Sequence, residues 1–362
     1  MTSRSDYLPA LDGLRAISIL LVIFSHAWMG HLVPGGLGVT IFFFISGFII
    51  TRTLLIEKAR NGIIGIRTFY MRRFFRLIPA LLVFVLLSAT LVAMLEGRVP
   101  WLDMLAALFY YSNYWDIAGY FHEGVLLSPF SITWSLAVEE HYYLIFPFAF
   151  LLMVKLPLRW ALMGLISVCL IVLVWRGILF AELGNTATDT YRIYKATDTR
   201  LDSIVYGVIA SWLIWYRPNL LKVWGHGAWT VLGLALLLFC LMYRDQAFRD
   251  VERYSLQGLA LLMIFPWTVL KNTWGSRLLS HRLFLYVGKI SYSLYLYHWL
   301  VFVLIDHYAA HLQLPIRIAL MLAASFVLAD LSWRMVERAG HRLRKRFMLD
   351  PQKEGLSRAT VQ

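Results

Sequence analysis

Charged residues are scarce in this sequence. Of its 362 residues only 15% are Asp, Glu, Lys or Arg, whereas 60% are hydrophobic, and the mean hydropathy is +0.65. A soluble globular domain has about 25% charged and about 45–50% apolar residues. The shortage of charge therefore excludes a soluble enzyme, a disordered protein and a fibrous protein. Because the apolar excess is too large for one anchor on a soluble domain, we predict that most of the chain lies in a membrane.

Cysteine and acidic residues are also few. Cys169 and Cys240 are the only cysteines, and both lie in apolar runs, so we expect no disulfide framework. Lys and Arg number 34 against 21 Asp and Glu. That balance is compatible with nucleic-acid binding, but in a chain this apolar it favours basic residues that anchor cytoplasmic loops. No nucleic-acid partner is expected.

Long apolar runs take the place of the missing charge. A membrane-spanning helix needs about 20 mostly apolar residues, and an even number of spans leaves both termini on one side. The inner segments then hold roughly three Lys or Arg for each one in the outer segments, which predicts cytoplasmic termini. The first run lacks a cleavage site, so we expect it to be retained. The fold class is an all-α integral membrane protein with about ten spans, near residues 12–30, 37–56, 77–96, 132–154, 160–180, 200–216, 227–243, 254–270, 283–305 and 316–336.

The spans leave few long connections. We predict one multi-span domain over residues 1–337 and a basic cytoplasmic tail without ordered structure over 338–362. In the outer segment 97–131 a partly inserted helix is expected at Trp101–Asn113, because Trp and Tyr favour the interface. The polar segment 181–199 is expected to form a lip over an outward-facing pocket. No inverted repeat of the kind found in many transporters is visible.

An arginine and a histidine share the first span. A charged residue within a span is costly and points to function. Arg15 and His26 are eleven residues apart, which on an α-helix is about 1100°, so both point to one face about 16 Å apart along the axis. With the amino terminus inside, Arg15 lies near the cytoplasmic end and His26 toward the outer leaflet.

Further polar residues mark later segments. In FYMRRFFRLIPA, Arg73 and Arg76 face one way on a helix; they are either interfacial anchors or a phosphate clamp. Ser46-Gly47 is interpreted as a site of close helix packing. Glu139 and Glu140 diverge by about 100° on a helix, so at most one is expected to face a central cavity.

At this point the motifs resemble those of a known family. LDGLRAIS with the Arg-to-His spacing, GGLGVTIFFFISGFIIT, RRFFRLIP, ITWSLAVEEHYYLIFP, RLDSIVYG and SYSLYLYHW follow the order found in the acyltransferase-3 family of integral membrane O-acyltransferases. The resemblance runs from Tyr7 to Glu337. It implies about ten spans and the transfer of acyl groups, mostly acetyl, from acyl-CoA to hydroxyls of glycans and other acceptors.

The resemblance also implies roles for individual positions. The essential pair would be Arg15 and His26, the RxxR motif Arg73 and Arg76, and the late histidine His298. The acidic residue of WSLxVE would be Glu139. The family often has Glu-Arg-Pro before its tail, whereas this chain reads Glu337-Arg338-Ala339; the change touches a helix terminus and is not expected to affect the chemistry. Some members add a hydrolase-like domain at the carboxyl end, and none is expected here.

Together these observations predict an acetyltransferase of the bacterial inner membrane. Acetyl-CoA is the expected acyl donor, its nucleotide end held by Arg72, Arg73 and Arg76, and no metal is expected. His26 is the expected general base for a hydroxyl of an extracytoplasmic or lipid-linked glycan, such as an O-antigen or exopolysaccharide; a covalent acyl-histidine intermediate is equally allowed. Membrane lipid is the surrounding partner. The residues expected to bind the acceptor or support the site are Asp12, Ser135, Tyr142, Arg200, Asp202, Tyr292 and His298.

One alternative belongs to another functional class. A proton-coupled transporter would use His26, Glu139, Arg200 and Asp202 as a relay. The lack of a repeat and of paired broken helices weighs against it.

Overall fold

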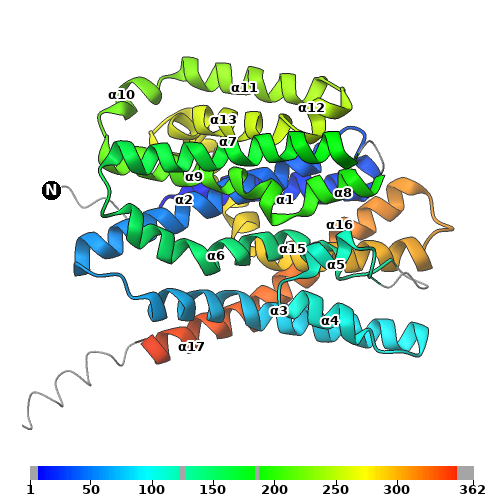
Figure 1. Ribbon diagram of the computed structural model, residues 1–362. Helices are drawn as coiled ribbons and strands as arrows, with labels where there is room; N and C mark the ends of the chain where they lie inside the picture. The colour runs from blue at the N-terminus through cyan, green and yellow to red at the C-terminus, as the bar shows by residue number, and fades with distance from the viewer. Residues whose placement is uncertain (1–6, 122–126, 184–186, 349–362) are drawn as a thin grey trace, which may run out of the picture.

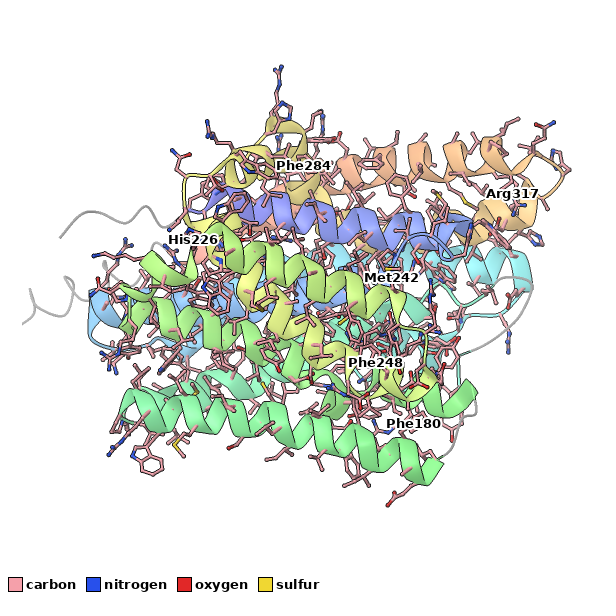
Figure 2. All side chains as sticks on the ribbon, turned by 90° about the horizontal axis from the view of Figure 1, so that it is seen from above. Phe180, His226, Met242, Phe248, Phe284 and Arg317 are labelled. Carbon is pink, nitrogen blue, oxygen red and sulfur yellow. The ribbon has the colours of Figure 1, made fainter. Side chains whose placement is uncertain are left out.

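The computed structural model of the protein describes residues 7–121, 127–183 and 187–348. These residues form helices and no β-strand, so the all-α class is confirmed. Figure 1 shows the long helices running along one common direction, which gives the bundle two ends. Figure 2 views it from above: His226 lies toward one end, and Met242, Phe248 and Arg317 lie toward the other.

The helices are of unequal length. Nine are at least sixteen residues long, α13 is a thirteen-residue helix packed within the bundle, and the others are shorter. In chain order they are α1 Pro9–Phe24, α2 Gly35–Asn61, α3 Ile66–Glu96, α4 Trp101–Leu108, α5 Ser112–Ile117, α6 Trp134–Met153, α7 Leu158–Leu183, α8 Ala187–Lys195, α9 Thr197–Tyr216, α10 Leu220–Trp224, α11 Gly227–Met242, α12 Gln246–Asp250, α13 Arg253–Phe265, α14 Trp274–Leu279, α15 Arg282–Tyr308, α16 Leu314–Ser332 and α17 Arg338–Met348.

Several of these helices are suited to a membrane. Within the described residues, six helical stretches are long and apolar enough to cross one, so the chain is a multi-pass membrane protein. A helix also occupies each of the ten predicted spans, but α9, α11, α13 and α15 are shorter or more polar than the six. Ten spans and cytoplasmic termini therefore stay predictions. The six stretches are Pro9–Met29, Gly35–Asn61, Ile66–Glu96, Ser131–Met153, Leu158–Leu183 and Leu314–Arg344.

Glycines set the closest helix contacts. Helices α2 and α9 form the most extensive pair in the bundle. A Cβ atom on Gly207 would lie 1.9 Å from the carbonyl oxygen of Phe44, and one on Gly47 would lie 2.0 Å from that of Ile204. Only residues without a side chain allow the two backbones to approach this closely. The expected packing role is therefore met at Gly47, whereas Ser46 has a polar contact described below.

Three segments differ from the sequence expectation. The basic segment before residue 77 is the first half of α3, which continues through Pro79. The chain after Glu337 forms α17, which packs on α3; a Cβ atom on Gly340 would lie 2.4 Å from the Phe75 carbonyl oxygen. The helix packs through the buried Gly340, whereas its Leu343 is exposed, and the composition of the tail does not reveal this contact. The single helix expected at Trp101–Asn113 is instead divided between α4 and α5. Residues 349–362 lie outside the described part.

The glycine contact between α2 and α9 gives a direct test of the packing. We expect Gly207→Ala to destabilise the protein by about 1–3 kcal/mol, because the new methyl group overlaps a backbone carbonyl that has no free space to move into. The measurement is thermal unfolding of the purified protein in detergent. The matched control is Gly164→Ala on α7, where a Cβ atom has nothing within 4 Å; it should be neutral or slightly stabilising. Equal melting temperatures for the two variants would contradict the packing argument.

Candidate functional site

Two histidines meet where α1 ends. His26 is the second residue of the kinked turn Ser25–Met29, and its Nδ1 lies 3.0 Å from Nε2 of His298 on α15. The rings are stacked, with centroids 5.3 Å apart and an interplanar angle of 5°. The His26 ring also meets the edge of Trp299. His298 is fully buried, whereas His26 is exposed. The structure thus brings together two residues that are 272 positions apart in the sequence.

The hydrogen bonds fix which nitrogen of each ring carries a proton. Nδ1 of His298 lies 2.7 Å from the carbonyl oxygen of Tyr295 and 3.1 Å from that of Leu294. A carbonyl oxygen only accepts, so this nitrogen is the donor and Nε2 of a neutral His298 is the acceptor. His26 therefore donates through Nδ1. Its Nε2 is left with an unprotonated lone pair, and this is the atom that a base needs.

A pocket with an empty volume of about 860 Å³, which includes space open to solvent, lies inside the bundle between α1, α2, α3, α6 and α15. Its wall residue Tyr295 packs against His298, with ring centroids 5.8 Å apart. The side chain of Tyr295 therefore separates the pocket from the histidine pair. Six of the thirteen site residues predicted from the sequence line the wall: Arg15, Arg73, Arg76, Ser135, Glu139 and Tyr292. The wall also contains Ser46, Tyr110, Glu140, Tyr143 and Tyr295.

Glu139 is held by two hydroxyl groups. Ser46 Oγ donates to one carboxylate oxygen at 3.0 Å, and Tyr143 Oη donates to the other at 2.8 Å. The guanidinium of Arg73 lies 4.7 Å from the centroid of the Tyr143 ring. Glu140 lines the same pocket. The expectation that at most one of the two carboxylates faces the cavity is therefore wrong, because the pocket covers enough of the α6 surface to admit both.

Three guanidinium groups share this pocket. Arg73 and Arg76 come from consecutive turns of α3, and Arg15 comes from α1. Within the described residues none of the three forms an ion pair with a carboxylate closer than 4 Å. Each is only partly buried and is reached from the pocket. A phosphate or carboxylate that enters would therefore meet three available forks of N–H donors.

Three predicted residues lie elsewhere. Arg72 forms an ion pair with Glu57 and does not line the pocket, because it lies about 100° around the helix from Arg73. Asp12 accepts a hydrogen bond of 2.8 Å from the Tyr7 hydroxyl. Tyr142 faces a separate apolar groove between α6, α7 and α9. These residues lie on sides of their helices that do not face the pocket. Their closeness in sequence to a motif does not reveal on which side they lie.

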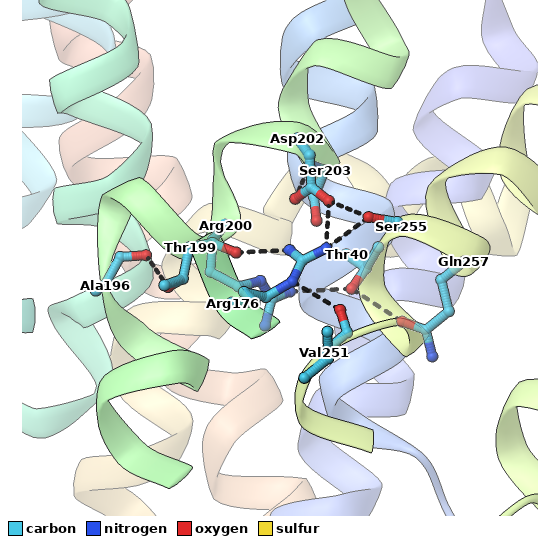
Figure 3. Close-up of polar contacts among 10 residues, drawn as sticks. All are labelled: Thr40, Arg176, Ala196, Thr199, Arg200, Asp202, Ser203, Val251, Ser255 and Gln257. Carbon is cyan, nitrogen blue, oxygen red and sulfur yellow. Dashed lines mark hydrogen bonds and ion pairs between the residues drawn. The ribbon is translucent and has the colours of Figure 1, made fainter. Parts of the chain in front are cut away.

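Arg200 and Asp202 belong to a different network, shown in Figure 3. Asp202 pairs with Arg176 at 2.8 Å, and Arg176 also donates to the carbonyl oxygens of Thr199 and Val251. Arg200 donates to Thr40 Oγ1 at 3.0 Å. All of these charged side chains are fully buried between α2, α7, α9 and α13. No hydrogen bond among the described residues connects this network to Glu139 or to His26.

The expected lip is represented by α8, since residues 184–186 are outside the described part. Lys195 pairs with Asp116 at 2.7 Å, which ties α8 to α5. Arg192 donates two hydrogen bonds to Asp198, at 2.9 and 2.6 Å. Burial would raise the pKa of Asp198, but these hydrogen bonds and the nearby positive charge hold the pKa below its ordinary value. The segment is thus fastened over this end of the bundle.

A polar cluster next to His26 escaped the sequence analysis. Trp28 has a φ of 64°, in the left-handed region that favours glycine. Its indole N–H donates to both oxygens of Asp306, at 3.2 and 3.1 Å, and Asp306 also pairs with Arg317. Strained backbone persists only where its surroundings hold it. The cluster of Trp28, Asp306 and Arg317, here named the clasp, holds the turn that follows His26.

The sequence of this chain is similar to those of known proteins. The model of one family, described as an acyltransferase domain, matches residues 8–334. The chain belongs to the acyltransferase-3 family. Its relatives include the O-acetyltransferase OatA of Staphylococcus aureus (strain NCTC 8325 / PS 47), which is 33% identical over 98% of this chain and 61% of its own length. A protein of Staphylococcus aureus (strain COL), provisionally named as an O-acetyltransferase, is 33% identical over 92% of this chain and 57% of its own length.

The chain spans about three fifths of the length of the curated relatives that it matches. No solved structure gives a significant match.

We expect the clasp to keep the turn that follows His26 ordered. Asp306→Asn removes the charge that binds both Trp28 and Arg317, so backbone amides of residues 27–33 should exchange with deuterium at least tenfold faster. Hydrogen–deuterium exchange with mass spectrometry measures this. Asp330→Asn is the matched control, because Asp330 on α16 also accepts hydrogen bonds from an arginine, Arg334, and from an aromatic residue, Tyr286. Unchanged exchange in the Asp306 variant would show that the turn does not depend on the clasp.

Proposed function

We propose that the protein is an O-acetyltransferase of the bacterial inner membrane that moves an acetyl group from cytoplasmic acetyl-CoA to a hydroxyl of an extracytoplasmic glycan. One observation carries the proposal. An exposed histidine with an unprotonated Nε2 is held by a buried histidine, beside a pocket that contains three unpaired arginines. Membership of the acyltransferase-3 family supports the same reaction class.

The arginine pocket supports the binding of the donor. The nucleotide end of acetyl-CoA carries phosphates, which pair well with the guanidinium forks of Arg15, Arg73 and Arg76. The pantetheine arm is thin and flexible. On a regular helix, Arg15 and His26 are separated by about 16 Å, which such an arm spans. The thioester would then reach the histidine pair while the phosphates stay at the arginines, so no charged nucleotide crosses the lipid.

The histidine pair supports base catalysis. His26 Nε2 takes the proton of the acceptor hydroxyl as its oxygen attacks the carbonyl carbon of the acetyl thioester. The carbon–sulfur bond then breaks, and the thiolate of CoA takes the proton back from Nε2. The products are the acetyl ester and CoA. When His26 gains the proton it becomes positively charged, and the hydrogen bond from Nδ1 to His298 keeps the ring in place throughout.

Other pocket residues have supporting roles in this proposal. Glu139 orients the substrate through the hydroxyl groups that it holds, and its carboxylate offsets the positive charge of Arg73. Ser135 bonds to the hydroxyl of Tyr295, which donates to the carbonyl oxygen of Ile132 at 2.9 Å. Tyr292 donates to the Leu77 carbonyl oxygen at 3.0 Å. These bonds fix the pocket wall between the arginines and the histidine pair.

The acceptor is the least defined part of the proposal. A glycan such as an O-antigen or an exopolysaccharide would approach His26 from the outer side, and residues 1–337 would act as one catalytic domain. The transporter alternative finds no support, because its relay residues lie in separate networks: Asp202 pairs with Arg176, while Glu139 binds Ser46 and Tyr143.

The roles of the two histidines are separable by mutation. His26→Ala should lower kcat by about 10²–10⁴-fold, the range that a positioned base contributes. His298→Leu should lower kcat with little change in KM for acetyl-CoA, and His298→Gln, whose side-chain oxygen still accepts a hydrogen bond, should recover part of the loss. Release of CoA is measured with radiolabelled acetyl-CoA and protein in liposomes to which a membrane glycan extract is added.

The control for the histidine variants is His311→Ala, an exposed histidine in the connection after α15. It should keep full activity. Full activity of His26→Ala at normal expression would refute the base, and equal loss in the two His298 variants would refute the hydrogen-bond role.

The donor site predicts a different kinetic signature. Replacing Arg73 and Arg76 by alanine should raise KM for acetyl-CoA by about tenfold or more, since each charged hydrogen bond contributes about 1.5–3 kcal/mol. Arg72→Ala is the matched control, because Arg72 belongs to the same motif but pairs with Glu57 outside the pocket. A comparable rise in KM for Arg72→Ala would place the phosphates elsewhere.

A further inference from the structure

A second pocket lies beside the histidine pair on another face of α1. It has an empty volume of about 910 Å³ and is bounded by the turn before α2 and by α11, α12 and α13. Ser25, the residue before His26, is part of its wall. The pocket shares no lining residue with the arginine pocket inside the bundle. In Figure 2, Met242 and Phe248 mark the end of the bundle where α11 and α12 meet.

The charge of this pocket is of one sign. Arg244, Arg249 and Arg253 line it, and its wall contains no Asp or Glu among the residues that the structure describes. None of these arginines has a carboxylate within ion-pair distance in the described chain. Arg253 donates to the hydroxyl of Tyr254 at 3.1 Å, but its Nε has no partner. Three guanidinium groups without an ion-pair partner on a concave wall favour an anionic ligand.

A buried amide faces the same space. Gln257 is only 2% exposed, and its Oε1 accepts a hydrogen bond from Thr40 Oγ1 at 3.2 Å. Its Nε2 has no hydrogen-bond partner in the described structure, and Figure 3 shows this nitrogen on the side of the amide away from Thr40. An amide nitrogen carries two N–H donors. A ligand oxygen in the pocket would supply an acceptor for them.

The start of α2 adds to the positive potential. Gly35 and Gly36 line the pocket at the first turn of this 27-residue helix. The amino-terminal end of a helix presents free N–H groups and a partial positive charge to anions. A Cβ atom on Gly35 would lie 2.6 Å from that of Ser25, so the glycine allows the turn to lie against α1. The helix end and the arginines therefore act on the same volume.

We propose that this pocket binds an anionic group, a phosphate or a carboxylate, on the saccharide that accepts the acetyl group. The proposal rests on the proposed function and narrows its acceptor to a charged saccharide. Ser25 is adjacent to His26 in the chain, so an anion held by the arginines leaves neighbouring hydroxyls of the same saccharide within reach of the base. The anionic group would hold the saccharide in the pocket, and a hydroxyl elsewhere on the same saccharide would react.

The test is a binding measurement that needs no turnover. Protein is placed in nanodiscs of neutral phosphatidylcholine and titrated with glucose 1-phosphate, glucuronic acid and glucose, with binding followed by saturation-transfer difference NMR. The two charged sugars should bind at least tenfold more tightly than glucose, and raising the salt should weaken them. Arg249→Gln with Arg253→Gln should lower the affinity for charged sugars at least tenfold, and Gln257→Leu should lower it severalfold.

One control variant shows where the charged sugars bind. Arg98→Gln removes an arginine that pairs with Glu96 outside the pocket and should leave the binding of charged sugars unchanged. Equal affinities for charged and neutral sugars, or full affinity in the Arg249 and Arg253 variant, would overturn the proposal. So would loss of binding in nanodiscs that contain phosphatidylglycerol, since the anion would then be a lipid headgroup.

Failure here is distinguishable from failure of the proposed function. If His26→Ala abolishes CoA release while glucose 1-phosphate and glucose bind equally, the acetyltransferase stands and only the anionic acceptor is refuted. If charged sugars bind through Arg249 and Arg253 but no variant changes CoA release, the pocket stands and the chemistry assigned to His26 fails.

Discussion

The close contact between α1 and α15 fixes the position of the histidine pair. A Cβ atom on Gly288 would lie 2.0 Å from the carbonyl oxygen of Asp12, so the two backbones touch near the amino-terminal ends of α1 and α15. From that contact the helices run together until His26 meets His298. The distance between the two rings is therefore set by a contact between backbones, which does not depend on flexible side chains. The base proposed at His26 would keep one orientation over many turnovers on such a rigid support.

Arginine serves two different purposes in this protein. Arg176 is fully buried and bound by one carboxylate, one hydroxyl and two carbonyl groups, so its charge is satisfied inside the bundle. Arg73 and Arg249 instead face pockets and have no carboxylate partner among the described residues. The cost of an isolated charge in lipid is high. An arginine left unpaired at a pocket wall is therefore an informative signal, whereas a paired one is mainly structural.

Much of the fold was accessible from the sequence, and less of the site. Apolar runs located the long helices, and the motif order identified the family, because both depend on local patterns. The pairing of Arg72 with Glu57 and of Asp202 with Arg176 depends on which side of each helix meets a neighbour. That rotation is fixed by contacts between distant segments. The same is true of His298, whose type and spacing give no hint that it contacts His26.

Other features left no readable trace. The strained Trp28 lies in the turn after α1 and its partner Asp306 in the last turn of α15, and at the ends of membrane helices charged and aromatic residues are common. The helix after Glu337 was hidden by its basic composition, although Gly340 allows it to pack on α3. Ser46 was interpreted as a packing residue beside Gly47, and only the three-dimensional structure shows that its hydroxyl binds Glu139.

The two pockets are divided by aromatic packing. Phe43 lines the inner pocket and Tyr194 the outer one, and Trp134 lies between them, with ring centroids 6.3 Å from Phe43 and 4.9 Å from Tyr194. Rings packed at these steep angles offer no hydrogen-bonded path for water or ions. In the proposed reaction the donor and the acceptor arrive from opposite sides of the membrane, and this packing then keeps the ion gradients of the cell from being dissipated through the protein.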